Sequence, residues 1–311
     1  MTKFNAIVIG LGRIGLHYGF DLKRKQPASH ISAIMENKNL DLIGVCDSDK
    51  KSQDLFIEKY GNVVPVFDDY SNLFERLSRK EIECEIVVIA TPESTHKKIL
   101  ESLLKSLENT TKSVIIFCEK PLAENLVSAK EIEQMLKNPN LKIVVNHSRR
   151  WSNIWKEAHR LSKDIGKIKK GSFYFSTSPE NKEINQIRDG VHIADLIAWF
   201  NITGKTTINR LSVPYFIYDF YLWGTDGKIE ILNFGEKLNF YKVNTSSRFE
   251  NFSELELIHT KTVEESLLSN AYNEFVAFLN GKINSLSTNF DDAVLALDVF
   301  EKYVYDDKLA I

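Results

Sequence analysis

The sequence has no long apolar run and almost no excess of charge of either sign. Its longest uninterrupted apolar runs, such as residues 86–90 and 114–118, span only a handful of residues, whereas a membrane-spanning helix needs about 20. The 40 Lys and Arg residues nearly balance the 42 Asp and Glu residues, so the net charge is −2. No overall field therefore draws the chain to nucleic acid or to an anionic membrane, and we expect neither as a partner.

Cysteine is also scarce. Cys46, Cys84 and Cys118 lie far apart and form no C-x-x-C pair. An odd number of cysteines at such spacing predicts neither a disulfide framework nor a zinc site, and we expect no metal centre. The first apolar run stops at Gly10, which is too short for a secretory signal, so we expect a cytoplasmic protein.

What the sequence does have is a strand-and-helix pattern in its first half. With 311 residues and 43% hydrophobic content, the chain is long enough for two domains with sizeable cores. Short β-branched runs, apolar at both odd and even positions, alternate with amphipathic stretches. One of these stretches opens with Ser128 and Glu131 in capping-box positions. The runs are FNAIVIG, LDLIGVCD, VVPVF, EIVVIAT, SVIIFCEK and KIVVNHS. This alternation predicts an α/β domain with a doubly wound parallel sheet over residues 1–148.

The second half, residues 149–311, has a different pattern. Aromatic and β-branched segments follow one another, separated by turn sequences at 225–227 and 234–236, and two amphipathic helices close the chain. Consecutive meandering strands predict a large, open, mainly antiparallel sheet in an α+β domain. Such a sheet keeps one face exposed or pairs it with a second copy, so we expect a domain for substrate binding and oligomerisation.

Residues 10–15 read G-L-G-R-I-G directly after an apolar strand and before a predicted helix. In a dinucleotide-binding turn, Gly10 makes the tight turn, Gly12 lets the backbone approach a pyrophosphate, and Gly15 lets helix and strand pack closely. Arg13 and Ile14 complete the turn at the helix N-terminus, which favours an anion. The alternative is a glycine-rich turn without a ligand.

Asp47 ends the second apolar run, where a carboxylate hydrogen-bonds the ribose hydroxyls of an adenosine and repels a 2′-phosphate. It therefore favours NAD over NADP, although Lys50 and Lys51 leave NADP open. Asp47 follows Gly15 by 32 residues, against about 20 in the usual fingerprint. Pro27 lies between them and indicates a broken helix or an inserted loop. A helix-capping role for Asp47 is the alternative.

Two further motifs, ATPESTH at 90–96 and CEKP at 118–121, follow the fourth and fifth apolar runs. Both are predicted at the carboxyl ends of strands, where open α/β sheets bind ligands. Here we expect further cofactor-binding residues, namely Thr91, Pro92, His96 and Glu119.

Lys120 belongs to the second of these motifs, and its bond to Pro121 is a candidate for the cis form. An ammonium group at this edge of the sheet stabilises the alkoxide that develops during hydride transfer. The alternative is an exposed turn lysine.

His192 lies near the start of a predicted helix, in RDGVHIADL. An imidazole titrates near neutral pH and suits proton exchange with a hydroxyl group. Asp195, three residues on, shares its helix face and can orient the ring. A hydrogen-bonded structural histidine is the alternative.

Taken together, these motifs resemble the Gfo/Idh/MocA oxidoreductases. The resemblance covers nearly the whole chain and also includes NHSRRW, GTDGKIEI, NAYNEFVAFLNGK and FDDAVLALDVFEKYV. It implies an N-terminal Rossmann domain, a C-terminal domain with a large open sheet, and NAD(P)-dependent redox chemistry on sugars, cyclitols or sugar nucleotides. It also implies that Lys120 and His192 correspond to the catalytic lysine and histidine.

Two positions depart from the family pattern. Arg188 stands where the family commonly has Asp in D-x-G-x-H, with Asp189 one place later, and Glu93 stands where Asn is frequent. The guanidinium of Arg188 suits an anionic substrate group, and a solvent-facing arginine is the alternative. Together with Arg150 and Trp151, Arg188 and Asp189 are the candidate substrate-binding residues. For Arg150 and Trp151, salt bridging and core packing are the alternatives.

We therefore expect an NAD(P)-dependent dehydrogenase or reductase acting on a hydroxyl/keto group of a small molecule, assembled as a homodimer or homotetramer. Two other hypotheses stay open. One is a non-catalytic NAD(H)-binding regulatory protein on the same scaffold, which the exchange at Arg188 motivates. The other is an NAD-recycling enzyme that cleaves glycosides.

Overall fold

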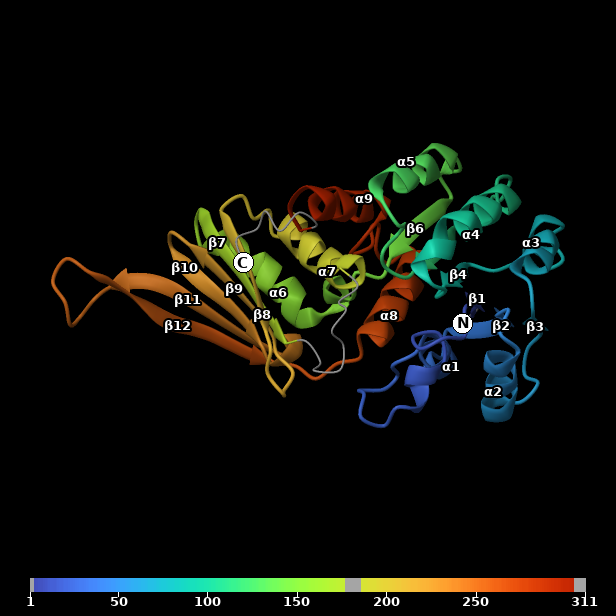
Figure 1. Cartoon of the computed structure of the whole chain (residues 1–311), viewed down its shortest axis with the longest axis horizontal. Helices are drawn as coiled ribbons and strands as arrows, with labels where there is room; N and C mark the ends of the chain where they lie inside the picture. The colour runs from blue at the N-terminus through green and yellow to red at the C-terminus, as the bar shows by residue number, and fades with distance from the viewer. Residues whose placement is uncertain (1–2, 177–185, 305–311) are drawn as a thin grey trace. The chain divides into compact units, whose positions relative to one another are not determined.

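The computed structural model describes residues 3–176 and 186–304, with the side chains of 186–189 and 303–304 outside the described part. The chain divides into two compact units, Met1–Ser148 with Glu265–Val294 and Arg149–Glu264 with Leu295–Ile311. Within the described residues, each unit contains one six-stranded sheet, and the two sheets can be followed in Figure 1.

The sheet of the first unit is parallel throughout, in the order β3-β2-β1-β4-β5-β6. Every residue of β4 and β5 is buried, as both faces of the sheet are covered. The doubly wound parallel sheet predicted from the sequence is confirmed. Its strands are β1 (Phe4–Ile9), β2 (Leu40–Cys46), β3 (Val66–Phe67), β4 (Ile86–Ile89), β5 (Val114–Cys118) and β6 (Leu141–Val145).

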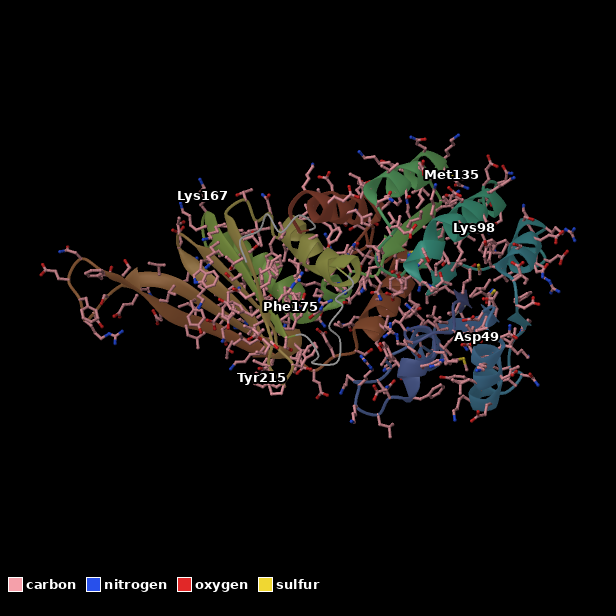
Figure 2. The ribbon with its side chains drawn as sticks, viewed as in Figure 1. Asp49, Lys98, Met135, Lys167, Phe175 and Tyr215 are labelled. Atoms are coloured by element: carbon pink, nitrogen blue, oxygen red, sulfur yellow. The ribbon has the colours of Figure 1, made fainter. Side chains whose placement is uncertain are left out.

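Helices connect these strands, and side-chain oxygens cap several of them. Asp49, which is labelled in Figure 2, accepts from backbone N–H groups at the start of α2, and Asp69 does so at α3. For α5 the sequence prediction was wrong, because the cap is Asn125 rather than Ser128. The helices of this unit are α1 (His30–Glu36), α2 (Lys50–Tyr60), α3 (Tyr70–Ser78), α4 (Glu93–Ser106), α5 (Leu126–Met135) and α8 (Leu267–Leu279), with α9 (Phe290–Val299) beginning here.

The helix expected directly after the glycine-rich turn is interrupted. One helical turn forms after Gly12, whose carbonyl accepts from the N–H of Leu16, and a short 3-10 helix (His17–Phe20) ends it. The chain then loops out and returns at α1, where the N–H of His30 donates to the carbonyl of Ile14 at 2.9 Å. The predicted broken helix is thus confirmed, and its two pieces are joined by backbone hydrogen bonds.

The second unit holds a mixed sheet in the order β12-β11-β10-β9-β7-β8, in which only the β7–β8 pair is parallel. The mainly antiparallel sheet predicted from the sequence is confirmed. Its strands are β7 (Ile168–Ser176), β8 (Lys205–Leu211), β9 (Tyr218–Gly224), β10 (Gly227–Leu232), β11 (Lys237–Thr245) and β12 (Ser253–Thr262). Its longer helices are α6 (Asn153–Leu161) and α7 (Gln186–Trp199), and a π-helix (Phe300–Val304) follows the end of α9.

One face of this sheet carries the core of the unit. In β10, Ile229 and Ile231 point into that core, where they join Trp155 of α6 and Leu196 of α7. The alternate residues of β10 lie on the opposite face, which is polar and aromatic. No helix in the described residues is both long and apolar enough to cross a membrane.

Candidate functional site

Five chain segments meet the carboxyl edge of the parallel sheet, where each strand ends. Backbone hydrogen bonds hold neighbouring segments in register there, from the N–H of Gly10 to Cys46 and from the N–H of Asn146 to Cys118. The segments follow β1, β2, β4, β5 and β6 and contain Gly10–Gly15, Asp47, Thr91–His96, Glu119–Pro121 and Asn146. All the expected cofactor-binding residues are thus gathered at one edge of one sheet.

A different physical reason explains each of the three glycines in the turn. Gly10 has φ +99°, and a Cβ there would lie 2.5 Å from the carbonyl oxygen of Ala90. A Cβ on Gly15 would overlap the carbonyl oxygen of Gly10. At Gly12, in contrast, a Cβ would meet no atom within 4 Å, so the backbone borders open space. Of the other turn residues, Arg13 is exposed and Ile14 is half-buried.

Asp47 is half-buried beside this turn. Its Oδ2 accepts from the N–H of Leu11 at 2.6 Å, and its Oδ1 accepts from the N–H of Asp49 at 2.8 Å. Each carboxylate oxygen has a second lone pair, which leaves acceptor capacity for two hydroxyl groups. The helix-capping alternative belongs to Asp49, which caps α2.

His96 joins the two motifs that follow β4 and β5. It is fully buried, with Nδ1 at 2.8 Å from the carbonyl oxygen of Pro121 and Nε2 at 2.9 Å from that of Thr91. Thr91 is half-buried, while Pro92 is exposed at the start of α4. His96 therefore links the two loops, and the Lys120–Pro121 bond in the second of them is cis.

Glu119 lies 9% exposed at the end of β5 and is held by side chains from two other segments. Its Oε1 is 2.6 Å from Asn146 Nδ2, which donates to it, and 3.0 Å from His30 Nε2; His30 Nδ1 is 2.8 Å from Tyr272 Oη. Burial by itself raises the pKa of Glu119. The hydrogen bonds from His30 and Asn146 and the positive charge of Lys120 outweigh burial, so the pKa is lower than usual.

Sequence reasoning missed His30, Tyr272 and Asn146. The signal for His30 was concealed by the looped-out segment, which separates it from the glycine-rich turn. Tyr272 lies on α8, more than 240 residues along the chain from His30, and no spacing rule connects them.

In the second unit, α7 carries His192 and Asp195 one turn apart. His192 is half-buried, and Asp195 is 2% exposed. Arg150 donates to Asp195 Oδ1 from Nε at 2.9 Å and from Nη2 at 2.8 Å, and its guanidinium lies over the ring of Trp199. Trp151 is fully buried. The side chains of Arg188 and Asp189 lie outside the described residues, although their backbone belongs to α7.

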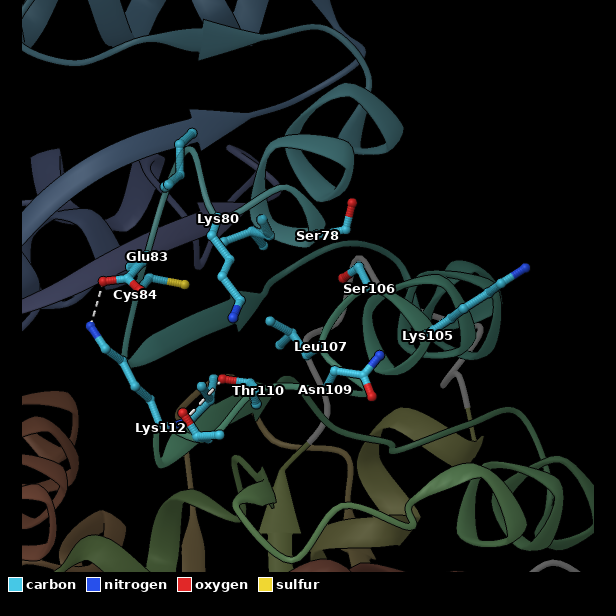
Figure 3. Close-up of a pocket in the computed structure, with 14 residues that line it drawn as sticks. Ser78, Lys80, Glu83, Cys84, Lys105, Ser106, Leu107, Asn109, Thr110 and Lys112 are labelled. Atoms are coloured by element: carbon cyan, nitrogen blue, oxygen red, sulfur yellow. Dashed lines mark hydrogen bonds and ion pairs between the residues drawn. The ribbon is translucent and has the colours of Figure 1, made fainter.

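A cavity of about 190 Å³ opens at the other edge of the parallel sheet, at the amino ends of β4 and β5 (Figure 3). Lys80, Cys84 and Asn109 are among its lining residues, and an ion pair joins Lys112 to Glu83 there. Burial raises the pKa of the Cys84 thiol far above its ordinary value. This cavity contains none of the expected site residues. In the described part of the chain, no group of three or more His, Cys, Asp or Glu side chains is arranged to hold a metal ion.

Residues 4–147 match the model of an oxidoreductase family with an NAD-binding Rossmann fold, Gfo/Idh/MocA. The resemblance stated from the sequence is confirmed for them, and a bound nicotinamide cofactor is what this family's fold holds.

A curated protein is similar over part of the chain. It is the scyllo-inositol 2-dehydrogenase (NAD(+)) of Bacillus subtilis, 28% identical over 167 residues, which are 54% of this chain. The match spans 42% of that relative's own length.

Solved structures resemble nearly the whole chain. An Agrobacterium radiobacter oxidoreductase, in complex with NAD+, L-tartaric acid and magnesium, has a TM-score of 0.69 at 16% identity and covers 98% of this chain and 96% of its own. The UDP-N-acetylglucosamine 3-dehydrogenase of Acidithiobacillus ferrooxidans has a TM-score of 0.73 at 14% identity and covers 98% and 97%. At such identities, these structures establish the fold of both units.

The residues present fit NAD. Open space borders Gly12 where a diphosphate approaches the backbone, and Asp47 keeps acceptor capacity beside it. One turn of helix begins at Gly12, and the start of a helix favours an anion.

Proposed function

We propose that this chain is an NAD-dependent oxidoreductase that moves a hydride between nicotinamide and a hydroxyl/keto group of a polyol, sugar or sugar-nucleotide derivative. The observation that carries the proposal is the unfilled space at Gly12 beside the carboxylate of Asp47. The family match over residues 4–147 supports the cofactor. The names of the relatives, an inositol dehydrogenase and a UDP-sugar dehydrogenase, support the substrate class.

Asp47 is the residue proposed to select NAD. Its two oxygens are already oriented by the N–H groups of Leu11 and Asp49, so little ordering is needed when ribose hydroxyls bind. The negative charge disfavours a 2′-phosphate at the same place.

Bound NAD supplies or accepts the hydride. Lys120 holds an ammonium group at the carboxyl edge of the sheet, and there it is proposed to stabilise negative charge on the substrate oxygen. His192 is half-buried on α7, and it is proposed to exchange the hydroxyl proton. Asp195, one turn further along α7, is proposed to orient His192. Arg188 and Asp189, with Arg150 and Trp151, remain the proposed substrate-binding residues.

The sheet of the second unit supports a second proposal, that copies of the chain associate. Its β12 strand has a run of exposed apolar side chains, with Leu255 at 47%, Leu257 at 51% and Ile258 at 51% exposure. Apolar side chains gathered on a strand at the sheet's edge are typical of an interface. Analytical ultracentrifugation tests this: a sedimentation coefficient of a monomer at micromolar concentration would refute it.

Isothermal titration calorimetry with NAD+, NADH and NADP+ tests the function directly. We expect NAD+ and NADH to bind and NADP+ to bind at least tenfold more weakly. Nicotinamide absorbance followed with a panel of inositols, aldoses and UDP-sugars then tests turnover. Binding without turnover on every substrate would favour the regulatory alternative that Arg188 motivates, and absence of NAD binding would refute the proposal.

A further inference from the structure

Another cavity, of about 330 Å³, lies in the first unit along the outer edge of β6, the last strand of the parallel sheet. One wall is the strand itself and the other is the connection between α8 and α9, so we call it the β6-edge cavity. It is lined by Leu136, residues 141–144, Phe278, residues 284–286 and residues 288–291. The residues proposed for the cofactor and for the reaction are not in this lining, so the cavity needs an explanation of its own.

The lining of the β6-edge cavity is mainly apolar and has no net charge. Ile143, Val144 and Phe290 are buried. The charged lining residues are Lys142 and Asp291, one of each sign, and both are exposed. Apolar walls and a volume of roughly 300 Å³ or more are typical of a small-molecule site. The balance of charge favours an uncharged molecule over an ion.

Thr288 adds a polar group that has no partner. The residue is 0% exposed, and its Oγ1 has no hydrogen bond among the described residues. A buried hydroxyl without a partner costs stability, and native proteins rarely leave one. Because no bond has to break, rotation about χ1 turns this hydroxyl towards the cavity at little cost. Thr288 therefore offers a donor and an acceptor to a molecule in the cavity.

The backbone of β6 adds a second pair of polar groups. Asn140, just before the strand, accepts from the N–H of Val114, and the N–H of Asn146, just after it, donates to Cys118. The even-numbered residues of β6 therefore bond to β5. Alternate residues of a strand point their N–H and C=O groups to opposite sides, which directs those of Ile143 to the outer edge. In the part of the chain that the structure describes, neither of these two groups has a hydrogen-bond partner.

We propose that the β6-edge cavity is a second ligand site, for a small uncharged molecule that carries an amide group on an apolar body. A primary amide has a donor beside an acceptor, which matches the C=O and N–H of Ile143. The second lone pair of the amide oxygen accepts from the Thr288 hydroxyl. The apolar body then packs against Phe278 and Phe290 and removes their surface from water. This inference goes beyond the proposed function and does not depend on it.

Benzamide is the probe, because it joins an apolar ring to one primary amide. Toluene has the ring without the amide, and benzoate has a charged group without a donor. NMR on the full chain with labelled Ile, Leu and Val methyl groups follows the three titrations at Ile143, Val144 and Leu286. We expect benzamide to shift these signals, and toluene and benzoate to bind at least about fivefold more weakly, the loss of one hydrogen bond. Unshifted signals with benzamide, or equal affinities for the three probes, would overturn the proposal.

Thr288→Val tests the hydroxyl, since valine has nearly the same shape without the oxygen. We expect benzamide to bind about fivefold more weakly and the free protein to melt about 2–4 °C higher, because an unpaired buried hydroxyl is gone. Thr207→Val is the control, because the Thr207 hydroxyl lies 2.6 Å from that of the buried Ser172, and its Tm should fall. A fall in the Tm of Thr288→Val, or an unchanged affinity for benzamide, would mean that this hydroxyl serves the fold and would overturn the proposal.

Leu286→Trp keeps the test decisive if Thr288→Val does not fold. The indole fills the cavity from the connection between α8 and α9, so we expect benzamide no longer to shift Ile143 and Val144. Calorimetry should give NAD+ the same Kd as in the parent. Benzamide shifts that survive in Leu286→Trp would overturn the site. Failure of the parent chain to bind NAD+ would refute the proposed function and leave the benzamide result standing.

Discussion

The backbone N–H of His30 donates to the carbonyl oxygen of Ile14 at 2.9 Å, and the next N–H, of Ile31, donates to Gly15 at 3.0 Å. In an uninterrupted α-helix the donor to Ile14 would be residue 18. Twelve residues are therefore looped out between the two pieces of one helix. Without them Asp47 would follow Gly15 by 20 residues instead of 32, which is the usual spacing of a dinucleotide-binding fingerprint.

This relationship predicts that the looped-out segment is not needed for the first unit to fold or to bind NAD+. Deleting residues 18–29 joins His17 to His30 and places the latter one helical turn after Ile14, with its hydrogen bond intact. We expect the shortened chain to fold and to bind NAD+ with a Kd within about threefold of the parent. The deletion also removes Ser29, which caps α1, but a continuous helix needs no cap at that point. The further cost is the hydrogen bond from Ser266 to Pro27, about 1 kcal/mol, partly offset by the loop-closure entropy that is no longer lost.

Thermal unfolding and calorimetry on the deletion variant check this. A matched control deletes residues 24–28 only, which shortens the loop without restoring the helical connection. If the longer deletion abolished folding while the shorter one was tolerated, the two pieces would not be parts of one helix.

Asp47 gives the second prediction. In Asp47→Asn one oxygen acceptor becomes an N–H donor and the charge is lost, so hydrogen bonds to the ribose weaken. We expect NAD+ to bind about ten- to a hundredfold more weakly, the loss typical of a hydrogen bond to a charged group, while NADP+ binding changes little. Asp41→Asn, within the strand β2 that Asp47 follows and paired with Lys3 at 2.7 Å, is the control. Equal losses for both coenzymes would show that Asp47 only supports the turn through Leu11.

Much of the first unit could be predicted because local signals agree with the global fold. Buried parallel strands must be apolar on both faces, and β4 and β5 read that way in sequence. The roles of Gly10 and Gly15 follow from backbone geometry, which only glycine tolerates at those positions. The interrupted helix was also signalled, by Pro27 and by the long spacing to Asp47.

The buried hydrogen-bonded side chains around Glu119 could not be predicted for the opposite reason. His30, Glu119 and Tyr272 meet only because α8 returns to the first unit and packs on α1. Such long-range pairing has no period and no fixed spacing in sequence. The predicted cap of α5 was wrong for a local reason: both Asn125 and Ser128 can cap a helix, and the helix begins after the earlier residue.

Lys120 gives the third prediction, for the reaction itself. Lys120→Met keeps the length of the side chain and removes its charge. We expect the hydride-transfer rate to fall by at least about a hundredfold, as when one charge-stabilising donor is removed, with the Kd for NAD+ within about threefold of the parent. Single-turnover absorbance of the nicotinamide and calorimetry measure the two quantities. Near-normal transfer in Lys120→Met would remove Lys120 from the reaction.

Arg150 and Asp195 give the fourth prediction, which distinguishes a role of Arg150 in protein stability from a role in substrate binding. Their side chains are only 4% and 2% exposed, so Arg150→Met leaves a buried carboxylate without this partner. We expect a loss of about 3–5 kcal/mol in the free energy of unfolding and a fall in Tm of roughly 10 °C. The double variant Arg150→Met/Asp195→Leu removes both charges and should recover most of that stability.

Kinetics on the double variant then address the substrate. If Arg150 contacts the substrate, KM rises in the double variant even though stability is restored. If Arg150 serves only the ion pair, both KM and Tm return towards the parent values in the double variant. A loss of order at His192 through the removal of Asp195 would lower kcat instead and leave KM near the parent value.

Glu119 gives the last prediction, a pH dependence of stability. Its pKa lies below the ordinary value near 4.5 in the folded protein, because hydrogen bonds from His30 and Asn146 outweigh burial. A carboxyl group whose pKa is lowered by folding stabilises the native state above its unfolded pKa and loses that contribution as pH falls. Glu119→Gln should therefore be less stable than the parent by about 1–3 kcal/mol at pH 7, and the difference should shrink as pH drops below about 4.5. Urea unfolding at pH 7 and at pH 4 measures both differences, with Glu133→Gln as an exposed control that shows almost none. A gap that widens on acidification would mean that the carboxyl group is protonated in the native state, contrary to the charge assigned to it.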